Sequence, residues 1–127
     1  MRVIRWDLLH TDESKSYFDE IMSKSSGSAL TIGGFDGPHV GHDRLFDSVL
    51  EASRRMNLVP GIVTFNRSPG ADKRPSEYPG DVSTLNLRLA RFAEKGFNFA
   101  VLIDFSGDFS KMTGSVFFDI LVKTVHM

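Results

Sequence analysis

Two histidines and several glycines lie close together in one short segment, and their types and spacing suit chemistry on a phosphate group. The segment reads Thr31-Ile-Gly-Gly-Phe-Asp-Gly-Pro-His-Val-Gly-His42. His39 and His42 stand three positions apart, and both imidazoles can donate hydrogen bonds to phosphate oxygens. We therefore predict a site that acts on a nucleoside triphosphate, with His39 and His42 as its catalytic residues.

The elements on either side of this segment would bring these groups together. Residues 29–32 predict a buried strand, and residues 43–56 predict an amphipathic helix whose apolar stripe is completed by Met56. A glycine-rich turn from a strand into a helix gathers backbone N–H groups and the positive end of the helix dipole at one point. Such a point binds phosphate.

The other residues of the turn are assigned to nucleotide binding. Gly41 has no Cβ, so a nucleotide can approach the backbone closely, and Gly37 suits a tight turn with positive φ. Asp36 is better suited to orienting the turn, through accepted backbone N–H bonds, than to touching phosphate. Phe35 fits the core better than a base-stacking role. The nucleotide-binding set is Gly33, Gly34, Phe35, Asp36, Gly37 and Gly41.

The histidine pair has two alternative interpretations, as ordinary surface residues or as zinc ligands. Short motifs match by chance, so an isolated pair of this spacing would favour ordinary surface residues; the preceding glycine segment reverses that preference. As zinc ligands the two histidines lack an evident third partner. His10 and His126 are expected to be exposed and to have no role in the site.

The rest of the chain alternates strand and helix patterns. Helical spacing is found around residues 17–22, in 85–95 before Gly96, and after Thr113 or Ser115. Further strands are predicted near residues 3–6, 58–65 and 97–105, the last apolar enough for a central position, while residues 66–81 predict a long loop. This order indicates an α/β fold with a parallel sheet and right-handed crossovers.

Composition narrows the class of protein. A chain of 127 residues that is 41% hydrophobic suits one domain. The net charge of −1 gives no overall attraction for nucleic acid or anionic lipid, and the absence of cysteine excludes disulfides and thiolate metal sites. No signal-peptide pattern or membrane-spanning run is found. We expect a cytoplasmic protein with no nucleic-acid or membrane partner.

The segment Gly33-Gly-Phe-Asp-Gly-Pro-His-Val-Gly-His42 resembles the nucleotidyltransferase superfamily that carries a His-x-Gly-His signature. Within it, Phe35-Asp-Gly37 is most similar to the adenylyltransferase domain of bacterial FAD synthetases, which are usually bifunctional with riboflavin kinase. The resemblance implies a Rossmann-like, three-layer α/β/α fold. It also implies adenylyl transfer from ATP to FMN, giving FAD and pyrophosphate, with Mg²⁺ on the phosphates.

Weaker matches extend the resemblance from about residue 30 to 122. Val63-Thr-Phe65 and Pro69 resemble a Thr-Phe-Glu-Pro-His-Pro segment that opens the flavin-side loop, and Ser83-Thr-Leu85 resembles the family's Leu-Thr-Thr start of a helix. Residues 103–105 and 117–122 resemble a later strand and helix. Asp104 lies near the C-terminal end of a predicted parallel strand, where open α/β sheets place their ligands. The flavin-side candidates are Thr64, Phe65, Asn66, Arg67 and Asp104, with ordinary strand-end or solvated residues as the alternative.

Three departures from the family pattern leave other functions open. Gly34 replaces a usual asparagine, and Asn66-Arg-Ser68 replaces Glu-Pro-His. The family's later Gly-x-Asp-Phe-x-Phe-Gly and arginine-ending segments, and its kinase domain, have no counterpart before Met127. We therefore expect residues 1–127 to form one partial domain. The alternatives are a non-catalytic nucleotide- or flavin-binding remnant and a transferase with another phosphorylated acceptor. An exposed edge of the partial sheet predicts possible self-association.

Overall fold

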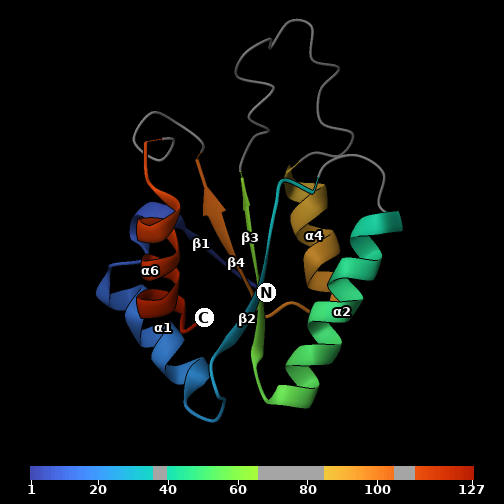
Figure 1. Cartoon of the computed structure of the whole chain (residues 1–127), viewed down its shortest axis with the longest axis horizontal. Helices are drawn as coiled ribbons and strands as arrows, with labels where there is room; N and C mark the ends of the chain where they lie inside the picture. The colour runs from blue at the N-terminus through green and yellow to red at the C-terminus, as the bar shows by residue number, and fades with distance from the viewer. Residues whose placement is uncertain (36–39, 66–84, 105–110) are drawn as a thin grey trace, which may run out of the picture.

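The structure, a computed structural model of the whole chain, is described for residues 1–35, 40–65, 85–104 and 111–127. Its strands and helices alternate along the chain (Figure 1). The elements in order are β1 (Arg2–Arg5), the 3-10 helix η1 (Trp6–Leu8), α1 (Asp12–Met22), β2 (Ser28–Ile32), α2 (Val40–Met56), β3 (Val59–Phe65), α4 (Leu85–Lys95), β4 (Phe99–Ile103) and α6 (Gly114–Val125). The expected loop of residues 66–81 lies outside the described residues.

All four strands run in parallel, in the order β1-β4-β3-β2. This confirms the predicted parallel sheet and the central position of β4. Gly61 of β3 stands opposite Phe99 of β4, and a Cβ at Gly61 would lie 2.3 Å from Cζ of the Phe99 ring. Only glycine leaves room for that ring on the surface of the sheet.

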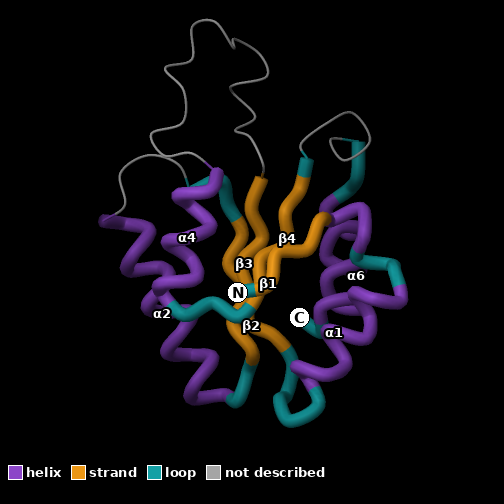
Figure 2. The backbone as a smooth tube through the Cα atoms, turned by 180° about the vertical axis from the view of Figure 1, so that it is seen from behind, coloured by secondary structure: helices purple, strands orange, loops and turns teal. Residues whose placement is uncertain are grey.

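Helices cover both faces of the sheet, so the fold has the three layers that were predicted (Figure 2). Helices α1 and α6 lie on one face and α2 and α4 on the other. The core accordingly has two parts. The first is built around Phe18, Phe99 and Leu121, and the second around Phe46 and Phe92. The two layers of apolar side chains fix the sheet between its helices.

The C-terminal end of α6 holds the beginning of β2. The backbone N–H of Ser28 donates to the carbonyl of His126, and its hydroxyl donates to the carbonyl of Val125. His126 ends the helix in the left-handed conformation, with φ of 59°. Its side chain is exposed, as expected, and lies 3.8 Å from Asp19. The backbone of His126 is therefore structural, which the sequence did not indicate.

Several expectations about burial were wrong. Strand β2 forms an edge of the sheet and is only partly buried, because strand order puts a neighbour on one side of it. Phe97 precedes β4 and packs with the α2–α4 core instead of with the first part of the core. Met56, which was expected to complete the apolar stripe of its helix, is exposed because α2 buries a narrower face.

None of the helices in the described ranges combines the length and the apolar character needed to cross a membrane.

Candidate phosphate-binding site at the carboxyl edge of the sheet

The predicted site residues fall at one edge of the sheet. Because the strands are parallel, their carboxyl ends lie together, and α2 and α4 begin at the same edge (Figure 1). Open α/β sheets bind their ligands at this edge. His42 lies in the first turn of α2, Thr64 and Phe65 end β3, and Asp104 follows β4 with its side chain exposed.

Part of the predicted set cannot be placed. Gly33, Gly34 and Phe35 directly follow β2, and Gly41 lies in the first turn of α2. The remaining predicted site residues lie outside the described residues: Asp36, Gly37, His39, Asn66 and Arg67.

Gly33 begins the turn at the end of β2. Its N–H donates to the carbonyl of Val63 at 3.0 Å, which extends the pairing with β3 by one residue. A Cβ on Gly33 would lie 2.9 Å from Cζ of the Phe35 ring. The ring of Phe35 therefore folds back over a position that only glycine leaves open.

The side chain of Phe35 lies in the core, as predicted from the sequence. The residue is 8% exposed although it has a positive φ of 58°. Its ring meets those of Phe46 and Phe92 edge to face, at centroid distances of 5.0 and 5.9 Å. The imidazole of His42 makes a similar contact with Phe35 at 5.4 Å. Thus the aromatic core packs against the imidazole that is predicted to meet phosphate.

The carbonyl of Gly34 is held by two side chains. The hydroxyl of Thr64, which is fully buried, donates to it at 3.2 Å, and Nη1 of Arg88 donates to it at 2.6 Å. Nη2 of Arg88 also donates to the carbonyl of Phe65 at 3.3 Å. Arg88 is 1% exposed and lies in the first turn of α4.

Arg88 was missed by the sequence analysis. A signal was present, because Arg88 stands three residues after Leu85 and four before Phe92, on the apolar stripe of its helix. An arginine on such a stripe must bury its charge or turn it outward, and the spacing alone does not distinguish the two.

Ion pairs join α2 to α4 beside the site. Nη2 of Arg91 lies 2.8 Å from both carboxylate oxygens of Asp43, and Lys95 lies 2.7 Å from Asp47. Helix α4 presents these basic side chains to one flank of α2. Asp43, in the first turn of α2, is therefore paired with the guanidinium of Arg91 from α4.

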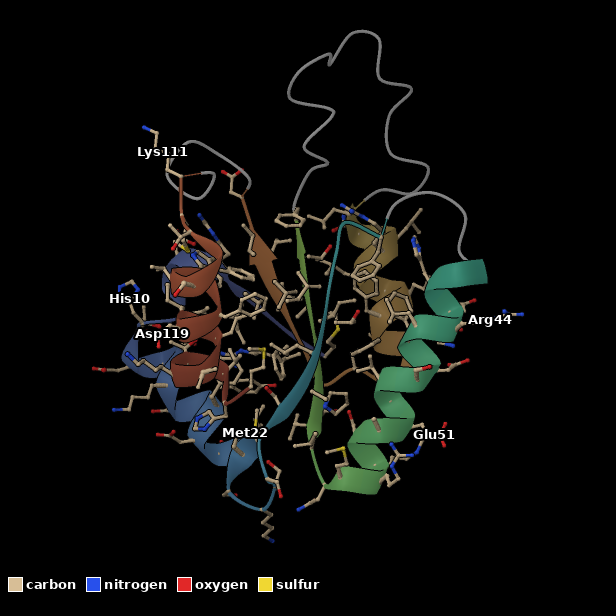
Figure 3. The ribbon with its side chains drawn as sticks, viewed as in Figure 1. His10, Met22, Arg44, Glu51, Lys111 and Asp119 are labelled. Atoms are coloured by element: carbon tan, nitrogen blue, oxygen red, sulfur yellow. The ribbon has the colours of Figure 1, made fainter. Side chains whose placement is uncertain are left out.

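Some of the charged side chains labelled in Figure 3 lie on the outer flanks of the molecule. Figure 3 shows His10 on the side of the sheet covered by α1 and α6, and Arg44 and Glu51 on the outer flank of α2. His10 is exposed, as expected. Within the described residues, no group of three or more histidine, aspartate and glutamate side chains is placed to hold a metal ion.

Comparison with solved structures supports the fold. A structure described as a macrolide-efflux protein from Streptococcus pneumoniae superposes with a TM-score of 0.65, covering 98% of this chain and 45% of that one. The two sequences are 22% identical, so this similarity shows a shared fold alone.

Comparison of sequences supports the family. The protein named bifunctional riboflavin kinase/FMN adenylyltransferase from Escherichia coli K12 is 33% identical over 102 residues, which are 80% of this chain and 33% of that protein. The protein of the same name from Buchnera aphidicola of Acyrthosiphon pisum is 26% identical over 104 residues, 81% of this chain and 33% of its own length. The chain therefore spans about a third of the length of these relatives.

The sequence profile described as FAD synthetase matches residues 21–127, which contain β2, the glycine turn, α2 and every later element. The resemblance drawn from the glycine and histidine segment is thereby confirmed. This chain belongs to the FAD synthetase family.

Proposed function

We propose that this chain carries the adenylyl-transfer site of an FAD synthetase, which joins ATP and FMN to give FAD and pyrophosphate. One observation carries the proposal: β2 leads through Gly33, Gly34 and Phe35 toward a helix whose first turn holds His42, in a chain of the FAD synthetase family. The names of the relatives include FMN adenylyltransferase activity, which supports ATP and FMN as substrates.

The start of α2 would bind the triphosphate. The first backbone N–H groups of a helix have no partner within the helix, and the helix dipole favours an anion there. Val40, Gly41 and His42 supply such groups at the edge of the sheet. The imidazole of His42 adds a side-chain donor in the same turn. His39 is proposed as a second donor from its place in the motif.

The reaction itself needs no protein nucleophile. A phosphate oxygen of FMN attacks the α-phosphorus of ATP, a new P–O–P bond forms, and the bond from the α-phosphorus to the β-bridging oxygen breaks. Pyrophosphate leaves with the electron pair of that bond. The protein contributes alignment of the two phosphates and stabilisation of the charge that develops on them. His39 and His42 are assigned to that stabilisation, and Mg²⁺ is expected to accompany ATP through phosphate oxygens and water.

FMN would approach from the ends of β3 and β4. Phe65 and Asp104 stand there, and Asp104 is open to a ligand. Thr64 lies at the same edge, with its hydroxyl directed to the carbonyl of Gly34. The flavin-side roles of Thr64, Phe65, Asn66, Arg67 and Asp104 remain predictions.

The test is incubation of the purified chain with ATP, Mg²⁺ and FMN, followed by assay of FAD and pyrophosphate. Formation of both products in equal amounts supports the proposal. Binding of ATP or FMN without product would instead favour a nucleotide- or flavin-binding remnant. Pyrophosphate release with a phosphorylated alcohol, but none with FMN, would show that the acceptor is a different molecule.

A further inference from the structure

A buried arginine links two neighbouring strands where both reach the candidate site. Arg88 lies in the first turn of α4, and its side chain is the largest fully buried one among the described residues. Its two terminal nitrogens donate to separate acceptors, the carbonyl of Gly34 after β2 and the carbonyl of Phe65 at the end of β3. The planar guanidinium is suited to such a two-point contact because its donors have fixed directions.

Burial of the Arg88 guanidinium costs desolvation free energy, whereas burial of an apolar side chain at the same position would not. Arginine stays charged in proteins, and removing a guanidinium from water is expensive even when it is hydrogen-bonded. The neighbouring stripe residues of α4, Leu89 and Phe92, fill the same interior with apolar groups. Apolar packing alone therefore does not account for a guanidinium at this position, and the contacts with two carbonyl groups give it a structural role.

The backbone that Arg88 contacts lies next to Phe35, which is in an unfavourable conformation. Phe35, directly after Gly34, has a φ of 58°, a conformation that costs a bulky residue about 1–2 kcal/mol and persists only where the surroundings impose it. The hydroxyl of Thr64 donates to the same Gly34 carbonyl as Arg88. Both side chains thus restrain the peptide that precedes the strained residue.

We propose that Arg88 is a positioning residue, which fixes residues 33–35, directly after β2, by bridging the carbonyls of Gly34 and Phe65. Because the ring of Phe35 contacts the imidazole of His42, Arg88 thereby sets where His42 stands relative to the end of β3, although Arg88 itself is buried. For its activity readout this proposal rests on the adenylyl-transfer function proposed above. A second readout is independent of activity. It is hydrogen exchange at the N–H of Gly33, whose bond to the carbonyl of Val63 extends the pairing of β2 with β3 to the residue before Gly34.

The decisive variant is Arg88→Lys, which keeps a buried cation but removes the planar pair of donors. We expect kcat for FAD formation to fall about ten- to hundredfold, with the KM values for ATP and FMN changed much less, because misplacement of groups that act in the transition state lowers the rate. Hydrogen exchange at the Gly33 amide should become faster. Exchange at the Ser28 amide, at the other end of β2 and bonded to His126, should not change.

Two further variants are compared with Arg88→Lys, one that removes the other donor to the Gly34 carbonyl and one that serves as a control. Thr64→Val removes the second donor to the Gly34 carbonyl at nearly constant volume, and it should shift both readouts in the same direction but less. Arg54→Met, at the exposed C-terminal end of α2, is the control for loss of an arginine and should change neither. Urea unfolding of each variant identifies the conditions in which all are folded.

Unchanged kcat and unchanged Gly33 exchange in Arg88→Lys would overturn the proposal. Equal acceleration at Gly33 and Ser28 would overturn it as well, since Arg88 would then support the whole fold instead of the turn. If the unaltered chain forms no FAD, the proposed function fails separately, and the exchange comparison between Gly33 and Ser28 still decides the role of Arg88.

Discussion

Arg91 places one nitrogen 2.8 Å from both carboxylate oxygens of Asp43, and this contact joins α4 to the first turn of α2. Asp43 lies at the end of a helix where an anionic ligand is expected, so its charge would repel a triphosphate. The paired guanidinium offsets that charge and draws the carboxylate toward α4. Both side chains are about one-third exposed, so the ion pair should add little to stability, and we expect its main effect to be on the proposed binding of ATP.

Arg91→Met should weaken ATP binding and leave the fold largely intact. Loss of the cation exposes the negative charge of Asp43 at the helix start, an effect of about 0.3–1 kcal/mol, which is a two- to fivefold rise in the Kd for ATP. Titration with ATP and Mg²⁺ at low salt measures it. Lys95→Met, which breaks the pair with Asp47 one turn further along, serves as the control and should change the Kd less. Restoration of affinity by Asp43→Asn in the Arg91→Met background would identify the charge as the cause.

His42→Ala should remove most adenylyl transfer while the chain still folds. A preorganised donor to charge that develops in the transition state is worth about 100- to 1000-fold in kcat. FAD formation by the variant, compared at equal folded fraction by circular dichroism, gives the result. His10→Ala is the matched control, because His10 is an exposed histidine on the opposite side of the sheet (Figure 3). Normal turnover in His42→Ala would remove the residue from the mechanism. His39→Ala is expected to behave as His42→Ala does.

Phe35→Ala should destabilise the protein strongly. The ring is buried among Phe46, Phe92 and the His42 imidazole, and removal of a buried phenylalanine side chain costs about 3–5 kcal/mol. Urea unfolding gives the free energy of unfolding for each variant. Phe118→Ala, at a residue 50% exposed on α6, should change it by less than about 0.5 kcal/mol. Similar losses in both variants would show that Phe35 is not an anchor of the turn.

The sequence was sufficient for the features that depend on local pattern. Alternating strand and helix periods predicted the parallel sheet and the helix after the glycine segment. That helix was predicted from residue 43, whereas α2 begins at Val40 and so includes His42 in its first turn. The continuous apolar run of residues 99–103 predicted a central strand, and β4 has strands on both sides. Each of these follows from neighbours in the chain, which a single sequence displays.

Features that depend on distant partners were not predictable in the same way. Asp43 and Asp47 look like solvent-facing residues until α4 is placed beside α2, 48 positions away in each pair. The edge position of β2 follows from strand order, which its own residues do not specify. Arg88 was missed because its acceptors are backbone carbonyls, which leave no mark on residue type. The positive φ of Phe35 is likewise imposed by its surroundings, since bulky residues disfavour it.

The Phe99 ring on Gly61 provides a test of how tightly the sheet is packed. Gly61→Ala would place a methyl group 2.3 Å from Cζ of the ring and closer than 3 Å to both adjacent ring atoms, where real Cβ atoms are not found. Phe99 is fully buried in the central strand, so the ring cannot move without disturbing the core. The resulting overpacking should lower the free energy of unfolding by about 1–3 kcal/mol. Gly114→Ala is the matched control, because nothing lies within 4 Å of the new methyl at the start of α6. That variant should keep or raise stability by up to about 1 kcal/mol. A Gly61→Ala protein as stable as Gly114→Ala would mean that the Phe99 ring can move away from the new methyl group without disturbing the core.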